Sequence, residues 1–392
     1  MNLTRRSMFK MLPAGLLVPA VLSACTIKRP NRPFDDWRRD FEVGVPARMK
    51  EAGVAGVAVA IVPNDATARY SAAFGFADVH QGRRLTVRTP MHLASVSKLF
   101  TAAALVQLFE ERGHDLDSNV NEFIDFSVRN PRYPRDPITP RQLLTHTSSI
   151  SDDGYEEQYE TTGAGDPTQS LSSFLREYLP EDGVTYSPTG TFLRAKPGTQ
   201  WSYSNVAIAL AGHLVERVSE QPFASYIHHH MLKPLGIHNA HWYLKDFAPD
   251  VLAKPYALDK GKFVELPQEG YRDVPAGMLR CSVDDLATSL RAMQGADGSA
   301  ILSPRTVTAM LRRQVEQSIA HYQGLGWTEE TIDGTALIGH SGVDTGATNM
   351  VVLTQDQHHA VAVLMNTDAT PEVDAFRSAI TADLISGAKC AG

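Results

Sequence analysis

The sequence lacks an excess of basic residues, an internal repeat and a nucleotide-binding glycine-rich motif. Lysine and arginine together number 37, against 44 aspartates and glutamates, so the formal net charge is −7. A chain of this charge is not suited to bind nucleic acid or an anionic membrane surface. No stretch matches GxxxxGK[ST], the pattern that cradles nucleotide phosphates. These observations argue against nucleic acid and an anionic membrane surface as partners, and they leave a small-molecule or short-peptide partner open.

Cysteine is scarce, and apolar residues are plentiful. The 392 residues include three cysteines, 43% apolar residues and 21% charged residues. This composition is typical of a globular protein, and the length suffices for one large domain or two with a substantial core. If Cys25 is consumed by processing, only Cys281 and Cys390 remain, and the sequence leaves open whether they pair.

The first 25 residues resemble a bacterial export signal. A basic segment (residues 1–10) precedes a short apolar stretch that Pro13 and Pro19 interrupt, which is too short and broken for a transmembrane helix. The stretch ends in Leu-Ser-Ala-Cys at 22–25, which resembles a lipobox and implies that Cys25 is lipidated. Twin arginines also resemble a twin-arginine signal, and a plain secretory signal is the alternative.

These features predict an exported protein that is anchored by lipid on Cys25 to the periplasmic side of a bacterial membrane. Removal of residues 1–24 takes away three basic and no acidic residues, so the mature charge is −10. The predicted organisation is a signal peptide at 1–24, the lipidated cysteine and a polar linker at 25–36, and one catalytic domain at 37–388. Membrane contact is expected through the lipid anchor only.

The apolar pattern predicts an α/β (α+β) fold. Two strands at 53–62 and 69–79, a terminal hairpin at 348–357 and 358–366, and a last helix at about 371–387 flank a long middle stretch of loops and helices. Strands at both ends favour a central antiparallel sheet built from both chain ends, flanked by helices, with an inserted and mostly helical lobe.

Lys98 stands at the start of an apolar helix, where the helix dipole disfavours a cation. Ser95 lies three residues earlier, so both side chains share one helix face. A lysine can take the proton of a serine nucleophile if burial and the helix terminus depress its pKa. The alternative is that Ser95 merely caps the helix, but a capping box requires Glu or Gln at position 98.

Two further motifs follow the Ser95-Val-Ser-Lys98 motif: Tyr203-Ser204-Asn205 heads an apolar helix, and His340-Ser341-Gly342 precedes the terminal hairpin. This order resembles the penicillin-recognising serine hydrolases, which include class C β-lactamases, D-alanyl-D-alanine carboxypeptidases, D-aminopeptidases and related esterases. The resemblance spans about residues 37–387 and implies a β-lactamase/transpeptidase-like fold that needs no metal and no other cofactor.

The resemblance implies a role for each motif residue. Ser95 is the expected acylated nucleophile, Lys98 its proton acceptor, Tyr203 a proton shuttle, and Asn205 a partner of both Lys98 and the substrate. His340 is expected to bind a substrate carboxylate or to tune Tyr203. Gly342 completes that motif, and the oxyanion hole is expected from the backbone N–H groups of Ser95 and Val343. Relatives often carry glycine where Val343 stands, so this chain has extra bulk there.

The implied activity is hydrolysis, through an acyl-serine intermediate, of small esters or of amides and D-amino-acid peptides. A β-lactamase or D-alanyl-D-alanine carboxypeptidase is one alternative, and a penicillin-binding sensor that is acylated without turnover is another. His340 in place of lysine slightly disfavours a β-lactamase. We therefore predict faster hydrolysis of small acyl esters than of β-lactams.

Four other features have simpler interpretations. His146 is expected to order the surroundings of the nucleophile. The acidic segment 151–166 reads as a solvated surface, with a lid over the cleft as the alternative. The adjacent histidines 228–230 point to different faces of a helix, and no HExxH occurs, so surface or packing roles are expected. The near match to GxSxG at 339–343 ends in Val343, which argues against an α/β-hydrolase.

Overall fold

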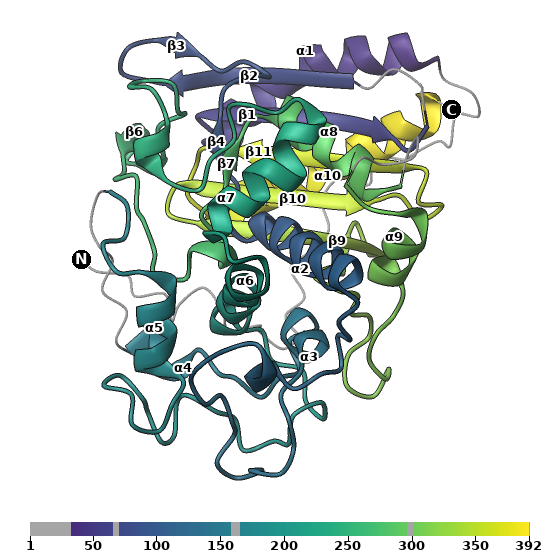
Figure 1. The fold of residues 1–392 in the computed structure, drawn as a ribbon. Helices are drawn as coiled ribbons and strands as arrows, with labels where there is room; N and C mark the ends of the chain where they lie inside the picture. The colour runs from purple at the N-terminus through teal and green to yellow at the C-terminus, as the bar shows by residue number, and fades with distance from the viewer. Residues whose placement is uncertain (1–32, 66–69, 158–164, 296–300, 392) are drawn as a thin grey trace, which may run out of the picture.

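A seven-stranded antiparallel sheet, built from both ends of the chain, forms the centre of the computed structural model (Figure 1). The structure describes residues 33–391 except for 66–69, 158–164 and 296–300. Across the sheet the strands are β3 (Arg83–Arg84), β2 (Tyr70–Asp78), β1 (Gly56–Pro63), β11 (His359–Met365), β10 (Ala347–Leu353), β9 (Thr335–Asp344) and β8 (Thr328–Ile332). The first strand β1 pairs with the last strand β11, which confirms the predicted sheet.

Helices cover both faces of this sheet (Figure 1). The helices are α1 (Phe34–Ala52), α2 (Lys98–Arg112), α3 (Pro140–Leu144), α4 (Asp153–Glu157), α5 (Leu171–Tyr178), α6 (Asn205–Ser219), α7 (Phe223–Ile227), α8 (Val283–Met293), α9 (Pro304–Leu311) and α10 (Pro371–Ala391). The terminal helices α1 and α10 pack together on one face, and α8 packs on β1 and β11 from the other.

The alternation of side chains along β1 explains why both faces are covered. Val57, Val59 and Ile61 belong to the apolar cluster formed with α1 and α10. Ala58 and Ala60 belong to the larger cluster on the opposite face. Because successive side chains of a strand point to opposite faces, β1 is buried on both sides. The small alanines leave room for α8 to approach the sheet closely.

A mostly helical lobe is inserted between β2 and β8, as the sequence predicts (Figure 1). It contains α3 to α7. The same stretch of the chain also forms two small β ladders that lie beside the sheet (Figure 1) and pair β4 (Met91–His92) with β7 (Arg280–Cys281) and β5 (Tyr256–Asp259) with β6 (Lys262–Glu265). The apolar helices α2 and α6 pack against each other where the lobe meets the sheet. The N-terminal ends of these two helices carry the first two sequence motifs.

The ends of the chain differ in how far the structure describes them. Helix α1 begins at Phe34, three residues before the predicted domain boundary at 37. The predicted signal peptide and Cys25 lie outside the described residues. Cys281 and Cys390 are both free cysteines, so the open question of their pairing is answered. Over the described ranges, no helix is both long and apolar enough to cross a membrane.

Candidate active site

Ser95 lies on a short 3-10 helix, η2 (Ala94–Ser97), which runs directly into α2. Its side chain is half-buried, whereas its neighbours in η2 are buried. The preceding residue, Ala94, has a φ of 48°, a left-handed conformation that is strained for a residue with a Cβ atom. The nucleophile candidate is therefore presented by a tight turn, and the regular helix begins only at Lys98.

Strand β9 presses directly on η2 through Gly342. A Cβ atom at this position would lie 2.4 Å from the carbonyl oxygen of Leu93 and 3.2 Å from the backbone nitrogen of Val96. Only glycine allows the third motif to approach the nucleophile turn this closely. The next residue, Val343, is half-buried beside this contact. The two segments expected to supply oxyanion-hole N–H groups thus lie side by side.

Lys98 is completely buried and faces three oxygen atoms. Its Nζ atom lies 2.9 Å from Ser95 Oγ, 2.8 Å from Asn205 Oδ1 and 2.6 Å from the carbonyl oxygen of Ala276. The same nitrogen lies 4.9 Å from the centre of the Tyr203 ring. The structure thus brings together the first two motifs, although Asn205 is 107 residues away in sequence.

The chemistry of these three oxygen atoms differs. The oxygens of Ala276 and Asn205 are carbonyl oxygens, which accept hydrogen bonds and have no proton to give. Ser95 Oγ is the one atom of the three that carries a proton. A neutral amine has two hydrogens and one lone pair, so its hydrogens satisfy the carbonyls while its lone pair faces the serine hydroxyl. The arrangement suits Lys98 to accept the proton of Ser95.

Tyr203 completes the arrangement on the other side of Ser95. Its hydroxyl group donates a hydrogen bond of 2.8 Å to Ser95 Oγ. Burial raises the pKa of Tyr203 above its ordinary value of 10, so this phenol is protonated at neutral pH. The ring of His146 stacks on the ring of Tyr203, with centroids 4.6 Å apart. His146 thus orders the site, as the sequence predicts, by holding a side chain that contacts Ser95.

His340 is buried and neutral. Its Nδ1 atom lies 2.6 Å from the carbonyl oxygen of Ser341, and because a carbonyl cannot donate, Nδ1 carries the hydrogen. Burial, with a smaller contribution from the charge of Lys98, lowers the pKa of His340 to about 3. The Nε2 atom is buried without a hydrogen-bond partner in the described part of the chain. The single N–H of His340 is therefore used, which disfavours binding of a substrate carboxylate.

Glu330 on β8 contacts the same motif and was not identified from the sequence. Its Oε1 atom accepts a hydrogen bond of 2.7 Å from the backbone N–H of Ser341. Burial raises the pKa of Glu330. A continuous run of four polar residues (328–331) offers no signal for such a role, because the contact depends on the pairing of β8 with β9. A carboxylate therefore lies behind the third motif.

Asp152 is a second residue whose importance the sequence did not reveal. The segment 151–166 was expected to be solvated, but Ser151, Asp152 and Tyr155 are buried, so that expectation is wrong for its first part. The reason is a polar contact: the Asp152 carboxylate accepts three hydrogen bonds from the N-terminal end of α6. Residues 158–164, which the alternative interpretation placed in a lid, lie outside the described residues.

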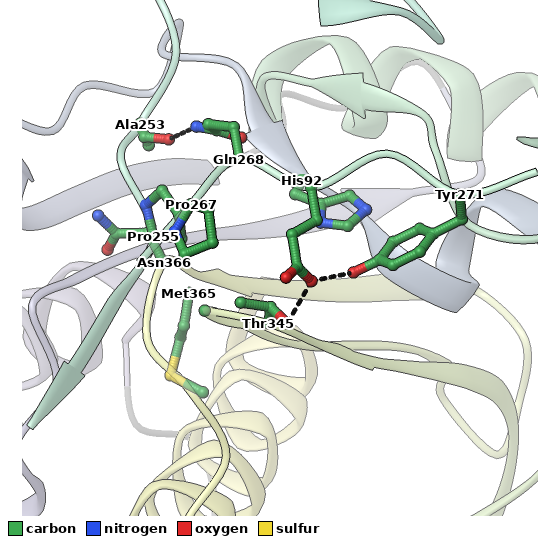
Figure 2. Close-up of a pocket in the computed structure, with 11 residues that line it drawn as sticks. His92, Ala253, Pro255, Pro267, Gln268, Tyr271, Thr345, Met365 and Asn366 are labelled. Atoms are coloured by element: carbon green, nitrogen blue, oxygen red, sulfur yellow. Dashed lines mark hydrogen bonds between the residues drawn. The ribbon is translucent and has the colours of Figure 1, made fainter. Parts of the chain in front are cut away.

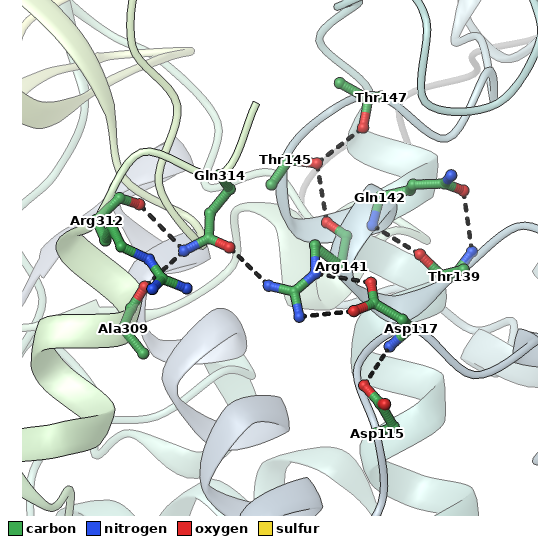
Figure 3. Close-up of polar contacts among 10 residues, drawn as sticks. All are labelled: Asp115, Asp117, Thr139, Arg141, Gln142, Thr145, Thr147, Ala309, Arg312 and Gln314. Carbon is green, nitrogen blue, oxygen red and sulfur yellow. Dashed lines mark hydrogen bonds and ion pairs between the residues drawn. The ribbon is translucent and has the colours of Figure 1, made fainter. Parts of the chain in front are cut away.

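Helix α3 fixes the segment that leads to His146 (Figure 3). Thr139 and Gln142 form a capping box at its start. Arg141 binds Asp117 through two nitrogen atoms, at 2.7 and 2.9 Å, and also donates a hydrogen bond to Gln314. These contacts tie α3 to two distant parts of the chain. His146, which stacks on Tyr203, therefore follows just after a rigidly held helix.

A small pocket lies beside the turn between β9 and β10 (Figure 2). Its lining includes Glu269, whose Oε2 atom accepts hydrogen bonds from Thr345 (2.8 Å) and Tyr271 (3.1 Å). The same Tyr271 hydroxyl lies closer to Asp344 Oδ1 at the end of β9, at 2.6 Å, so the two carboxylates share its single hydrogen. Ser95 is not among the lining residues. These polar groups hold the end of β9 in place, and with it the strand that carries the third motif.

Comparison with known protein families finds one match that covers most of the chain. A family model described as "Beta-lactamase" matches residues 45–384. This range includes all three sequence motifs.

Two curated relatives and one solved structure show the degree of similarity. Protein flp of Staphylococcus aureus is 23% identical over 333 residues, which cover 85% of this chain and 64% of flp, so the chain spans less than two thirds of that relative. Esterase EstB of Burkholderia gladioli is 27% identical over 307 residues, which cover 71% of this chain and 75% of EstB. The octameric penicillin-binding protein homologue from Pyrococcus abyssi aligns with a TM-score of 0.67 and 26% identity, covering 87% and 76% of the two chains.

Proposed function

This chain belongs to the beta-lactamase family, and on that premise we propose that it is a serine hydrolase that acts through an acyl-Ser95 intermediate. The observation that carries the proposal is the position of Lys98 Nζ, 2.9 Å from Ser95 Oγ and within 2.8 Å of the carbonyl oxygens of Asn205 and Ala276. The similarity to EstB supports an ester substrate. Without Tyr203 and Asn205 around this pair, the site would fit a protein that is acylated but does not turn over.

In the acylation step, Ser95 Oγ attacks the carbonyl carbon of the substrate and its proton passes to Lys98 Nζ. The negative charge then develops on the substrate oxygen, where the backbone N–H groups of Ser95 and Val343 are proposed to stabilise it. The tetrahedral intermediate collapses when the bond to the leaving group breaks. The leaving oxygen takes a proton from the Tyr203 hydroxyl, and Lys98 returns a proton to Tyr203.

In the deacylation step, water attacks the carbonyl carbon of the acyl-enzyme. Its proton passes to Lys98, because Tyr203 is already protonated, and the bond between the acyl group and Ser95 Oγ breaks as the serine regains a proton from Lys98. Asn205 holds Lys98 in place throughout through the 2.8 Å contact. Each group ends the cycle in the protonation state in which it began.

We further propose that the preferred substrates are small neutral esters. His340 offers no free N–H to a carboxylate, and Glu330 places a negative charge behind the same strand. An anionic substrate such as a β-lactam is therefore disfavoured at this position. Val343 adds a branched side chain beside the proposed oxyanion hole, which hinders a bicyclic acyl group more than a short linear one.

The test compares kcat/KM for p-nitrophenyl butyrate and for nitrocefin on one preparation, with Ser95→Ala as the control. We expect the ester to react faster and Ser95→Ala to lose both turnover and fluorophosphonate labelling while keeping its thermal unfolding temperature. A covalent adduct on the Ser95→Ala protein would refute the assignment of the nucleophile. A nitrocefin value equal to or above the ester value would refute the substrate class. Assays with D-alanyl-D-alanine peptides and D-amino-acid amides test the peptidase alternative.

A further inference from the structure

Two residues of the segment after α3 hold the residues around Tyr203. The carbonyl oxygen of His146 accepts a hydrogen bond of 2.8 Å from the backbone N–H of Ser202. The Nδ1 atom of His146 accepts one of 3.2 Å from the backbone N–H of Ser204. His146 is the first of the two residues. The second is Asp152, which binds the residues that follow Tyr203, at the start of α6.

The Asp152 carboxylate uses both oxygen atoms to hold the start of α6. Oδ1 accepts hydrogen bonds from the Ser204 hydroxyl (2.7 Å) and from the backbone N–H of Val206 (3.1 Å). Oδ2 accepts one from the backbone N–H of Asn205 (2.6 Å). Asp152 is only 8% exposed. A carboxylate buried to this degree is costly unless such donors surround it.

We infer that Asp152 is a positioning residue for the catalytic site, because it fixes the backbone of Asn205, whose side chain fixes Lys98. Two hydrogen bonds, 2.6 Å from Asp152 to Asn205 and 2.8 Å from Asn205 to Lys98, connect the buried carboxylate to the proton acceptor of Ser95. The inference rests on the proposed function. It assigns to Asp152 no contact with the substrate.

Capping of α6 does not by itself explain the burial of Asp152. The hydroxyl group of Ser204 already accepts a hydrogen bond of 3.0 Å from the backbone N–H of Ala207, which is the usual N-cap contact. Asp152 adds a second layer of acceptors to a helix end that has its cap. Within the second motif it binds both Ser204 and Asn205, and a neutral acid or an amide cannot replace the carboxylate fully at both oxygen atoms.

Protonation of Asp152 weakens this contact. Burial, with a smaller contribution from the carboxylate of Asp273, raises the pKa of Asp152 to about 6, although the hydrogen bonds from the start of α6 oppose the rise. Two other titratable groups, Tyr178 and Tyr203, also interact electrostatically with it, and both are protonated at neutral pH. Two basic groups contact the segment that it holds: His146 at the backbone N–H of Ser204, and Lys98 at the side chain of Asn205. When the carboxyl is protonated, one oxygen carries a hydrogen and is a poorer acceptor for the N–H groups of α6.

The test uses Asp152→Asn in the full chain, with Asp153→Asn as the matched control. The two substitutions remove the same charge from neighbouring residues, but Asp153 is exposed. In Asp152→Asn one carboxylate oxygen is replaced by an amide nitrogen, which cannot accept a hydrogen bond. This nitrogen must face either the N–H of Asn205 or the two groups that donate to Oδ1. At about pH 8 we expect its kcat for p-nitrophenyl butyrate to fall by about tenfold or more, with little change in KM, since the site binds substrate but is misaligned. Asp153→Asn is expected to match the wild type.

The pH dependence separates positioning from a general loss of structure. The ratio of wild-type to Asp152→Asn kcat is expected to fall toward one between about pH 8 and pH 5, because the wild-type carboxyl also becomes neutral there. A ratio that stays constant with pH, or a variant with wild-type kcat, overturns the inference. Asp152→Ser, which introduces no amide donor, replaces the Asn variant if that variant fails to fold, with the same expectations. If the wild type has no Ser95-dependent esterase activity, the proposed function fails instead, and the two failures are distinct.

Discussion

Lys98 Nζ lies closer to a backbone carbonyl, the oxygen of Ala276 at 2.6 Å, than to Ser95 Oγ at 2.9 Å, the serine that it is proposed to activate. This carbonyl belongs to a second 3-10 helix, η7 (Val274–Ala276), which Thr101 of α2 also binds through a hydrogen bond of 2.6 Å to Pro275. The contact therefore has a rigid support. It sets the direction of the amine, so that the lone pair of Lys98, in the neutral form that the proposed mechanism requires, is free to face Ser95 Oγ at 2.9 Å.

Replacement of Lys98 by arginine tests whether the residue accepts a proton or only supplies charge. A guanidinium group stays protonated in proteins and has no acceptor lone pair. We expect Lys98→Arg to reduce kcat/KM for p-nitrophenyl butyrate by about a thousandfold. Lys196→Arg is the matched control, because Lys196 is half exposed and paired with Asp136. Near-native activity of Lys98→Arg would contradict the proposed role.

Removal of the Tyr203 hydroxyl tests the proton shuttle. Tyr203→Phe keeps the ring that stacks on His146 but removes the donor to Ser95. We expect kcat to fall by about a hundredfold, with KM changed little, because the leaving group loses its proton source. Tyr133→Phe, which removes a hydroxyl bound to the carbonyl oxygen of Arg194, is the control. If Tyr203→Phe retained wild-type kcat, the leaving group would have to obtain its proton elsewhere.

The sequence predicted the parts of the site that depend on local spacing or on recognised motifs. Ser95 and Lys98 are three residues apart, so helical geometry alone brings their side chains together. Asp152 and Glu330 could not be found in this way, because their contacts to Ser204 and Ser341 depend on tertiary packing. An acidic residue in a polar run reads as exposed unless the donors that bury it are known.

The same distinction holds for the fold. The strands at both ends were predicted because they are continuous apolar runs, and β1 and β11 are buried on both faces. Strand β8 and helix α1 were not predicted. Strand β8 is largely polar, and α1 contains an internal proline, Pro46, with only a narrow buried stripe. Such elements are stabilised by what they pack against more than by their own sequence pattern.

Acidification is expected to destabilise the protein through His340. The pKa of His340 is about 3 in the folded chain against an ordinary value of 6.5. Between these values the unfolded chain binds a proton that the folded chain does not, so the free energy of unfolding falls as pH is lowered below about 6.5. The pKa of His146 is also lowered, mainly by burial, and its effect has the same sign. Asp152 has the opposite effect, because its pKa is raised from 3.8 to about 6. Between pH 6 and pH 3.8 its protonation stabilises the folded chain as pH is lowered.

The contribution of His340 can be isolated with His340→Gln. From pH 7 to 5 the wild type is expected to lose about 2 kcal/mol of unfolding free energy to this residue, since each pH unit below the unfolded pKa costs about 1.4 kcal/mol. Urea unfolding at both pH values measures the change. In His340→Gln, the loss of unfolding free energy from pH 7 to pH 5 should be smaller than in the wild type by about that amount. An identical difference in both proteins would mean that His340 is not the group that resists protonation.

Glu330 is expected to disfavour anionic substrates, and Glu330→Gln tests this with little structural change. The carboxylate accepts the backbone N–H of Ser341 at 2.7 Å, and a glutamine oxygen can accept the same hydrogen bond. The substitution therefore keeps the contact between β8 and β9 while it removes one negative charge from behind the third motif. A unit charge at this range in a partly buried site changes the binding of an anion by about 1 kcal/mol. We expect the ratio of kcat/KM for nitrocefin to that for p-nitrophenyl butyrate to rise by about fivefold at low ionic strength and about pH 8, with a smaller rise in high salt.

Glu329→Gln is the matched control for this substitution. Glu329 lies one residue away, and strand alternation turns its side chain to the other face of the sheet. Its carboxylate lies 3.7 Å from an exposed histidine, His321. If both variants raised the ratio equally, the effect would come from net charge alone, and if neither did, the carboxylate behind the third motif would have no part in substrate selection.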